Sequence, residues 1–554
     1  MRGPPLRILY GLMIHRAGRT LARPRGFCYN RVRSLRKFPR RSMFFRPTLL
    51  IATLTLCAVA VAAQTPAPVR SHVERFSTVE ERAERVEAEA GSKIAADPRD
   101  AASLNSRGVA RLFLGRYKEA AEDLARAVAL RPESADYQSN LGSALWKVGR
   151  VEQAVAAERA AVKLDEKNFS AHYQLGRFLM RLGDKERVTE AATHLRRAAE
   201  IDPRQYDVRF ELIAAYRALG DRAQASNQLD FLSDARPSDP RVFYTSALLA
   251  TDRDDVEAAV RDFKEALRRD PTLSGAWQDL GVAYVKLKRW NDAVETFAEL
   301  ARLRPDSVDA AYLHALALFN AGRAEDSERE ARRALRINAG AAEAHTLLGV
   351  ILASRGTSNA EAAESLAQAA ALRPESFDAH FYLGRVLYAL KDTTGAVREL
   401  RAASVIDPRH AETRFFLGTA LEAVGDSDAA MVEYAELVKL DPRSAFGLVG
   451  QGALLVKQGK IEEAVAALKS ATTLDPKNFE ARLALGRAHA LAGRYEEAVE
   501  SLKAAAALAP YRSDAHYQLG LALRRLGREE EAKREFDTVN RLNTEFRTGA
   551  TTRQ

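Results

Sequence analysis

The chain has 554 residues, of which 47% are hydrophobic and only 7% aromatic, so alanine and leucine must supply much of its apolar surface. The net charge of +10 suggests a nucleic-acid or membrane partner. However, residues 1–73 hold 14 Lys and Arg and no Asp or Glu, and the rest of the chain carries 70 basic and 74 acidic side chains. A weakly acidic body argues against a nucleic-acid binder.

The first predicted element is a basic leader at residues 1–63. Its residues 48–63 form a 16-residue, mostly apolar run preceded by Arg46. A comfortable membrane span needs about 20 residues, and small side chains end this run, so we expect a signal peptide cleaved before Gln64. An uncleaved membrane anchor is the alternative, and it would be the chain's only membrane contact.

Residues 1–42 are unusually long and arginine-rich for a signal peptide. Three interpretations stay open: Met43 is the true start, Arg40 and Arg41 belong to a weak twin-arginine signal, or the segment is an organellar transit peptide. A lipoprotein box ending at Cys57 is disfavoured, because Leu56 is bulky where a small residue is required. Both cysteines of the chain lie in this leader, so the body can form no disulfide, thiolate metal site or cysteine nucleophile.

A linker at residues 64–76 and a capping helix at residues 77–100 are expected next. Ser77 and Glu80 have the spacing of a capping box. Apolar residues then recur along one helical stripe: Val79, Ala83, Val86, Ala90 and Ile94.

A 34-residue period fills residues 101–546 and defines thirteen units. Prolines mark most unit boundaries: Pro98, Pro132, Pro203, Pro237, Pro271, Pro305, Pro374, Pro408, Pro442, Pro476 and Pro510. Two longer gaps indicate insertions near Glu186 and Thr357. We expect these insertions to lengthen two turns inside units, either as hinges or contact loops or as tolerated changes of length.

Small residues recur at fixed positions within the 34-residue unit. Ten residues after each boundary, a glycine occurs in ten of the thirteen units: Gly108, Gly142, Gly176, Gly281, Gly349, Gly384, Gly418, Gly452, Gly486 and Gly520. An alanine recurs later in twelve units. We expect these residues to lie where the first helix of a unit crosses the second, so that a leucine at Gly384 would overpack the crossing and cost about 1–3 kcal/mol. Further glycines are expected to end first helices in the left-handed conformation: Gly115, Gly149, Gly183, Gly425 and Gly493.

This pattern resembles the tetratricopeptide repeat family over residues 101–546, about 80% of the chain. The resemblance implies an all-α, right-handed superhelical solenoid of about thirteen helix-turn-helix units, with the first helix of each lining the concave face. Units 240–273 and 308–341 depart from the pattern because they lack the glycine. Residues 547–554 are expected to form a polar tail.

Signals for catalysis are weak. The sequence contains no glycine-rich phosphate loop with its lysine and no HExxH motif. Gly447, Gly450 and Gly452 lie inside a predicted helix rather than after a strand, which excludes a dinucleotide motif. We therefore predict that the protein is not an enzyme and has no cofactor.

Four histidines share one register of the first helices: His172, His345, His380 and His516. Equivalent residues on packed helices stand about 10 Å apart, whereas one zinc ion needs its nitrogen ligands at about 2.0–2.1 Å. We therefore expect packing between repeats and no metal site, as for Trp277 in the same register.

The concave face carries the candidate partner-binding residues. Aromatic side chains follow its leading register, and arginines follow one turn later, which are the residue types that dominate interface hot spots. The candidates are Tyr173, Arg177, Phe210, Tyr244, Tyr312, Phe381, Arg385, Phe415, Arg487 and Tyr517. The alternative is that these rings pack against neighbouring helices. Asn140 stands at a position where some family members clamp a C-terminal carboxylate, but the accompanying basic residues are missing.

The sequence thus predicts a non-catalytic scaffold that binds a protein or peptide partner in the concave groove, exported to the bacterial periplasm. One alternative is an accessory subunit of an enzyme complex, such as glycan synthesis or export machinery. Another is a regulatory or chaperone-like module for envelope assembly.

Overall fold

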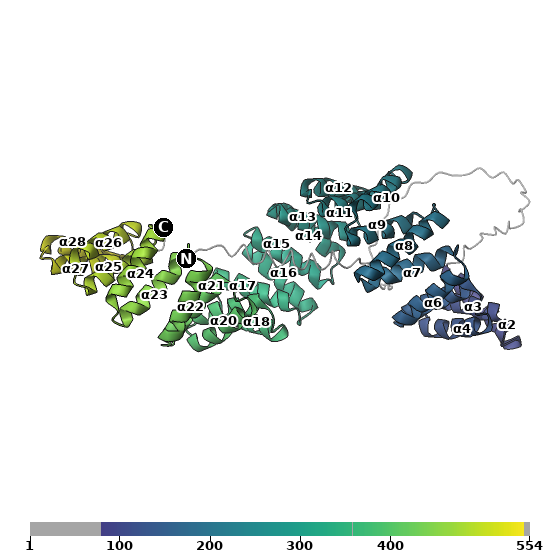
Figure 1. Ribbon diagram of the computed structural model, residues 1–554, viewed down its shortest axis with the longest axis horizontal. Coiled ribbons are helices and arrows are strands. Elements are labelled where there is room, and N and C mark those ends of the chain that lie inside the picture. The colour runs from purple at the N-terminus through teal and green to yellow at the C-terminus, as the bar shows by residue number, and fades with distance from the viewer. Residues whose placement is uncertain (1–78, 357, 548–554) are drawn as a thin grey trace, which may run out of the picture. The chain divides into compact units, whose positions relative to one another are not determined.

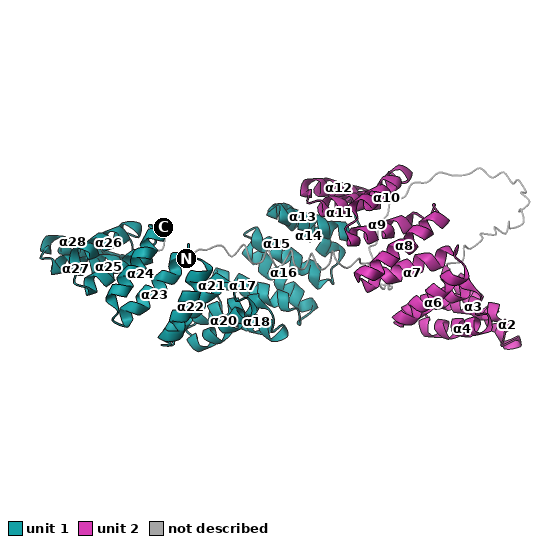
Figure 2. Cartoon of the chain, viewed as in Figure 1, with its two compact units in different colours: residues 1–13, 270–554 teal, residues 14–269 magenta. Residues whose placement is uncertain are grey.

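The computed structural model describes residues 79–356 and 358–547, in which every regular element is an α-helix. The described residues divide into two compact units, residues 79–269 and residues 270–547, here called the amino-terminal and carboxyl-terminal units (Figure 2). The predicted leader at residues 1–63, the predicted linker and Ser77 lie outside the described residues. Within the described part of the chain, no helix is both long and apolar enough to cross a membrane.

Eleven helices form the amino-terminal unit: α2 (Val79–Ala96), α3 (Ala101–Phe113), α4 (Tyr117–Leu130), α5 (Ala135–Lys147), α6 (Val151–Leu164), α7 (Phe169–Leu182), α8 (Lys185–Ile201), α9 (Tyr206–Leu219), α10 (Arg222–Ala235), α11 (Pro240–Asp252) and α12 (Val256–Arg269).

Sixteen helices form the carboxyl-terminal unit: α13 (Ser274–Lys286), α14 (Trp290–Leu303), α15 (Val308–Asn320), α16 (Ala324–Ile337), α17 (Ala342–Arg355), α18 (Asn359–Leu372), α19 (Phe377–Ala389), α20 (Thr393–Ile406), α21 (Ala411–Ala423), α22 (Ser427–Leu440), α23 (Ala445–Lys457), α24 (Ile461–Leu474), α25 (Phe479–Leu491), α26 (Tyr495–Leu508), α27 (Ser513–Arg525) and α28 (Glu529–Arg547).

Each odd-numbered helix from α3 onward packs against the helix that follows it, which gives thirteen helical hairpins (Figure 1). Within a unit, the second helix of one hairpin also packs against the first helix of the next. A hairpin therefore completes its core only with its neighbours, as expected for repeat proteins. The prediction of an all-α repeat solenoid with thirteen units is confirmed.

The turns between hairpins are set by local chemistry. In the turn after α8, for example, Asp202 accepts a hydrogen bond from the backbone N–H of Arg204 at 3.0 Å, and Pro203 between them cannot continue the helix. The same aspartate contact recurs in the turns before α3, α7, α13, α21, α23 and α25.

The turns inside hairpins use the left-handed conformation. All five glycines predicted to end first helices have a positive φ, between 75° and 88°. In three hairpins a residue with a side chain takes that place: Asp254, Lys288 and Lys391 have φ of 66°, 57° and 68°.

The recurring glycine in the first helix lies where the two helices of a hairpin cross, as predicted. A Cβ atom added to Gly384 would lie 2.6 Å from Cγ of Leu400, a fully buried residue of α20. The equivalent glycines of α3, α7, α17, α23 and α25 also face a leucine. The two helices of these hairpins can therefore approach this closely because glycine has no side chain at the crossing point.

The insertion near Glu186 does not lengthen a turn, so that prediction was wrong. The turn holds only Gly183 and Asp184, and the three extra residues extend α8 to 17 residues. The Asp184 side chain accepts a hydrogen bond from the backbone N–H of Arg187 at 2.9 Å and so caps the longer helix. The predicted insertion at Thr357 falls on a residue outside the described ones.

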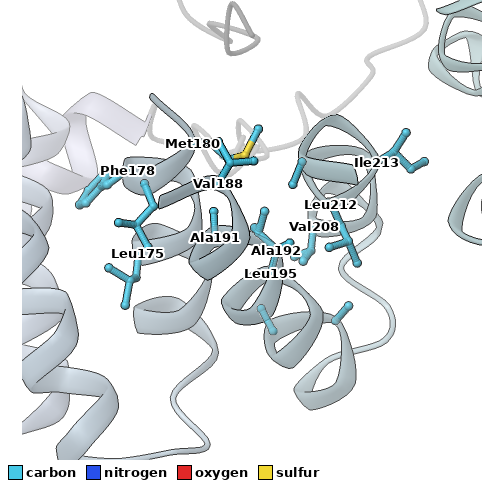
Figure 3. Close-up of a cluster of buried hydrophobic side chains, with 14 of the residues drawn as sticks. Leu175, Phe178, Met180, Val188, Ala191, Ala192, Leu195, Val208, Leu212 and Ile213 are labelled. Carbon is cyan, nitrogen blue, oxygen red and sulfur yellow. The ribbon is translucent and has the colours of Figure 1, made fainter. Parts of the chain in front are cut away.

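Figure 3 shows the core of the amino-terminal unit around this longer helix. Leu175 of α7, Ala191 and Leu195 of α8 and Leu212 of α9 belong to this cluster. Phe178 of α7 belongs to it as well, and its ring stacks on Trp146 of α5 at 4.2 Å. Three successive helices thus share one core.

The amino-terminal end of the array is covered by α2, which packs against α3. Its Ala83, Ala90 and Ile94 are buried, whereas Val79 and Val86 of the predicted stripe are exposed. The helix is also held by charge, because Glu87 accepts hydrogen bonds from Arg111 and Arg116 at 2.8–3.0 Å.

Candidate partner-binding surface

The first helices of successive hairpins lie close to one another within each unit. Contacts join α5 with α7 and α7 with α9 in the amino-terminal unit, and link α17, α19, α21, α23 and α25 in series in the carboxyl-terminal unit. No comparable contacts join successive second helices among the described residues. The first helices therefore form the inner side of each stack. Their shared surface, here called the first-helix face, carries the candidate residues.

In the amino-terminal unit, aromatic rings of this face are paired with guanidinium groups. The Arg177 guanidinium lies 5.3 Å from the ring centre of Tyr173, and that of Arg241 lies 4.5 Å from the ring centre of Phe210. Arg177 also lies 3.7 Å from Glu211. These five side chains are half-buried, so each keeps an accessible edge. The sequence analysis named three of them and missed Arg241 and Glu211.

Tyr244 of α11 is turned toward its own hairpin. Its ring lies 5.8 Å from that of Phe263, a buried residue of the second helix α12. The Tyr244 ring therefore packs within its own hairpin, and part of it remains exposed to solvent.

Two candidates in the carboxyl-terminal unit are core residues. Phe381 is 0% exposed and Tyr312 is 3% exposed. The Phe381 ring is enclosed by Phe377 at 5.5 Å, His410 at 5.1 Å and Phe416 at 6.1 Å. These two rings therefore pack against neighbouring helices, which was the alternative considered in the sequence analysis. Neither ring is accessible to a partner.

An aromatic cluster reaches the surface at α21 and α23. The Phe415 ring lies 5.4 Å from both Phe416 and Phe446, and Phe446 is 50% exposed. The Arg385 guanidinium lies 4.6 Å from the Phe416 ring centre and 3.5 Å from Glu412. Apolar rings therefore meet charged groups at an accessible edge.

Phe416 and Phe446 were not predicted, although one signal for Phe446 was available. The helix α23 carries a single charged residue, Lys457, among thirteen residues. A helix that is apolar on all sides is normally buried all round, whereas α23 leaves one ring half in solvent.

Arg487 of α25 and Tyr517 of α27 are exposed, as a partner-binding role requires. The Tyr517 ring packs at 6.1 Å from Phe536 of α28, which fixes its base. Leu491, one turn beyond Arg487, is also exposed.

Asn140, the clamp-like position, is bound within the array. Its side-chain amide donates a hydrogen bond to Oδ1 of Asn105 at 2.9 Å. Asn105 lies on α3, the first helix of the preceding hairpin. This contact links α3 to α5.

The histidine register forms hydrogen bonds to the turn that joins each hairpin to the one before it. In each case a side-chain N–H points at the backbone carbonyl six residues earlier, in the turn that precedes the helix. His380 contacts the Pro374 oxygen at 3.1 Å, His516 the Pro510 oxygen at 3.2 Å and His345 the Ala339 oxygen at 3.0 Å. Other side chains make the same contact in other hairpins: Gln138, Trp277, Arg414 and Arg482.

In three of these hairpins, the second ring nitrogen of the histidine faces a side chain of the second helix. Nδ1 of His380 lies 2.7 Å from Glu399, and Nδ1 of His516 lies 2.6 Å from Glu535. His172 has a different partner, because the matching residue of α8 is His194. The sequence analysis missed His194, although aligning α8 with α20 after the three-residue insertion would have revealed it.

A glutamate occupies a core position in the hairpin of α5 and α6. Glu158 is 0% exposed and fills the place against Gly142 that leucine fills in most other hairpins. Neither its carboxyl oxygens nor the hydroxyl of nearby Ser139 makes a hydrogen bond of normal geometry with the described residues. Burial raises the pKa of Glu158 to about 9, and Ser139 offsets only part of this effect.

Among the described residues, no three His, Cys, Asp or Glu side chains converge on one point. The first-helix face carries aromatic rings, guanidinium groups and apolar edges.

Two family models described as tetratricopeptide repeat match the chain. One matches residues 105–169, 139–206, 312–358, 347–408 and 449–513, and the other matches residues 184–249, 250–317 and 490–546. The TPR repeat-containing thioredoxin TTL4 of Arabidopsis thaliana is 36% identical over 95 residues, which make up 17% of this chain and 14% of that protein. The chain therefore aligns with only a small part of that relative.

Solved structures of similar repeat proteins are more distant. YrrB, described as a TPR protein with an unusual peptide-binding site, is 23% identical with a TM-score of 0.32, over 34% of this chain and 97% of that one. The Cut9–Hcn1 hetero-tetramer of the APC/C is 14% identical with a TM-score of 0.41, over 81% and 97%. MamA is 23% identical with a TM-score of 0.28, over 30% and 97%.

Proposed function

Because the chain belongs to the tetratricopeptide repeat family, we propose that it is a non-catalytic scaffold that binds a protein or peptide partner on the first-helix face. The observation that carries the proposal is the half-exposed ring of Phe446 on α23, in contact with Phe415 of α21. Large aromatic side chains at an accessible edge, beside guanidinium groups, are typical of interface hot spots.

The binding surface in the carboxyl-terminal unit combines Phe415, Phe446, Arg385 and Arg487. Aromatic rings on successive first helices can bury an apolar side chain of the partner, while the arginines can pair with its carboxylates or carbonyl oxygens. In the amino-terminal unit, the pairs Tyr173–Arg177 and Phe210–Arg241 offer a second region of the same chemistry.

We also propose that the protein is exported to the cell envelope of a bacterium. The support is the basic, acid-free leader and the apolar run at residues 48–63. Cleavage before Gln64 releases the body into the periplasm, and retention of the run leaves it membrane-anchored. Sequencing the amino terminus of the chain recovered from its native source distinguishes the two, and a cytoplasmic chain that starts at Met1 contradicts export.

The binding proposal is tested by crosslinking from position 446 in the native source, followed by affinity measurements with the partner recovered. Phe446→Ala is expected to weaken binding at least tenfold, because truncating an aromatic hot-spot residue typically costs about 2 kcal/mol or more. The matched control is Val432→Ala, since Val432 is 59% exposed but lies on the second helix α22.

Circular dichroism should show that both variants keep the wild-type helix content. If the partner binds Phe446→Ala and the wild type equally, the first-helix face of α21 and α23 is not the binding surface. Weaker binding by Val432→Ala instead would place the surface on the second helices.

A further inference from the structure

We infer that His172 and His194 form a binding site for a late first-row divalent metal ion, with Cu²⁺ the best geometric match. The two rings come from α7 and α8, and their Nδ1 atoms lie 3.0 Å apart. The ring centres are 5.1 Å apart and the planes are inclined by 41°. This site is independent of the first-helix face.

The surroundings favour the tautomer in which Nδ1 of each ring carries no proton. Nε2 of His172 lies 3.2 Å from the carbonyl oxygen of Glu166, which can only accept a hydrogen bond, so Nε2 carries the proton. Nε2 of His194 faces a carboxylate oxygen of Glu190 at 3.8 Å, which favours the same tautomer. Two neutral rings in this tautomer present two bare nitrogens to each other. A bound cation satisfies both at once.

An outer hydrogen bond of this kind is what metal-binding histidines normally have. Such a histidine usually donates its other ring N–H to a backbone carbonyl or a carboxylate, which fixes the tautomer and the ring orientation. His172 has such a hydrogen bond to the Glu166 carbonyl, and the ring of His194 faces the Glu190 carboxylate at 3.8 Å, a charge contact longer than a hydrogen bond. Glu190 is held in turn by Arg159, at 2.8 and 3.0 Å.

The separation of the nitrogens indicates which ion fits. Metal–imidazole bonds are about 2.0–2.1 Å long, so two nitrogens 3.0 Å apart subtend an angle of about 95° at the metal. Tetragonal Cu²⁺ and Ni²⁺ prefer adjacent ligands at about 90°, and Cu²⁺ binds nitrogen sites most tightly of the series. Water completes the coordination, because the protein supplies two ligands.

Charge and access are compatible with binding from solution. His172 is 6% exposed, and the His194 side chain is 18% exposed, so solvent reaches the pair from the His194 side. Asp165, Glu166 and Glu190 favour a cation, whereas Arg159 and Arg197 oppose it.

The chain contains its own controls. In the hairpins of α19–α20 and α27–α28, the equivalent histidine meets Glu399 or Glu535 instead of a second histidine. Replacing His194 by glutamate therefore recreates a pair that this fold already accommodates. His172→Gln copies Gln138, which makes the same contact to the preceding turn in the α5 hairpin.

The test is a titration of the full chain with CuCl₂, followed by electron paramagnetic resonance, with Cys28 and Cys57 replaced by serine to remove competing thiols. We expect a one-to-one complex whose spectrum shows coupling to two imidazole nitrogens. His194→Glu should lose one of the two nitrogens and bind at least tenfold more weakly, and the double variant His172→Gln/His194→Glu should lose the signal. His380→Gln should behave as the wild type.

Circular dichroism establishes that each variant is folded. Two results would overturn the inference. One is a wild-type spectrum that matches copper free in the buffer, which would mean that the two rings merely share a proton. The other is a two-nitrogen spectrum that persists in the double variant, which would place the copper elsewhere.

Discussion

Replacing Glu158 by leucine is expected to stabilise the amino-terminal unit. The carboxyl group is fully buried on α6 against Gly142, at a position where Leu124 and Leu195 pack in the flanking hairpins. The glycine that faces each of them leaves the same space, since a Cβ there would lie 2.5–2.7 Å from the facing side chain in all three hairpins. Leucine therefore fits without repacking, and it buries no polar atom.

The size of the effect follows from the pKa. The carboxyl group has a pKa of 4.5 in the unfolded chain and about 9 in the folded one. The folded state binds this proton more tightly, so the free energy of unfolding is largest below pH 4.5 and falls as pH rises toward 9. The slope is about 1.4 kcal/mol per pH unit, which amounts to a loss of about 3 kcal/mol at pH 7. Leucine has no ionisable group, so the gain in unfolding free energy from Glu158→Leu should grow with pH.

The assay is urea unfolding of both proteins at pH 5, 6, 7 and 8. Trp146 is a local probe, because its ring stacks on Phe178 of α7 at 4.2 Å. Replacing Trp277 and Trp290 by phenylalanine in both proteins leaves Trp146 as the single reporter. Other titrating groups affect both proteins alike and cancel in the difference.

The decisive quantity is the difference in unfolding free energy between Glu158→Leu and the parent. It should increase by roughly 1.4 kcal/mol per pH unit across this range. Glu158→Gln, which cannot ionise, should also unfold with a pH dependence that parallels the leucine variant. A difference that stays constant from pH 5 to pH 8 would refute the reasoning, because it would mean that the carboxyl group does not take up its proton on folding.

Three further predictions concern stability and are checked by urea unfolding. Gly384→Ala should destabilise the carboxyl-terminal unit by about 1–3 kcal/mol, because its new Cβ would lie 2.6 Å from buried Leu400; an unchanged midpoint would show that the helices can separate. Lys391→Gly should stabilise that unit by about 0.5–1 kcal/mol, because φ of 68° strains a residue with a side chain; a loss of stability would mean that chain entropy outweighs the strain. Asp123→Ala should destabilise the amino-terminal unit by about 3 kcal/mol, because it leaves the Arg107 guanidinium without its carboxylate partner and leaves Arg111 hydrogen-bonded to Glu87 alone; a change below 0.5 kcal/mol would contradict this.

The backbone of each hairpin could be predicted because its determinants are local. A glycine such as Gly425 ends a helix through its own φ, and Gly384 marks a helix crossing through its own lack of bulk. The same reasoning failed at Glu186, because three added residues can extend a helix as easily as a turn, and the sequence did not reveal that Asp184 would cap it.

The accessible surface was harder to predict because burial depends on neighbours from other hairpins. Phe381 and Phe415 share one register, yet the first is enclosed and the second is only half-buried. The difference arises from His410 and Phe416 of the next hairpin, which close over Phe381. A register assigns a residue to a helix face, whereas the size of the adjacent side chains decides whether solvent reaches it.

The contact between the first helix and the preceding turn has a consequence for how such arrays diverge. The Pro271 carbonyl is bonded by an indole, the Pro374 carbonyl by an imidazole and the Pro476 carbonyl by a guanidinium. The hairpins therefore share a side-chain N–H donor at this position, although the amino acid that supplies it differs. Engineers can therefore vary charge, metal affinity or fluorescence at this one position, hairpin by hairpin, while the joint between repeats keeps its bond.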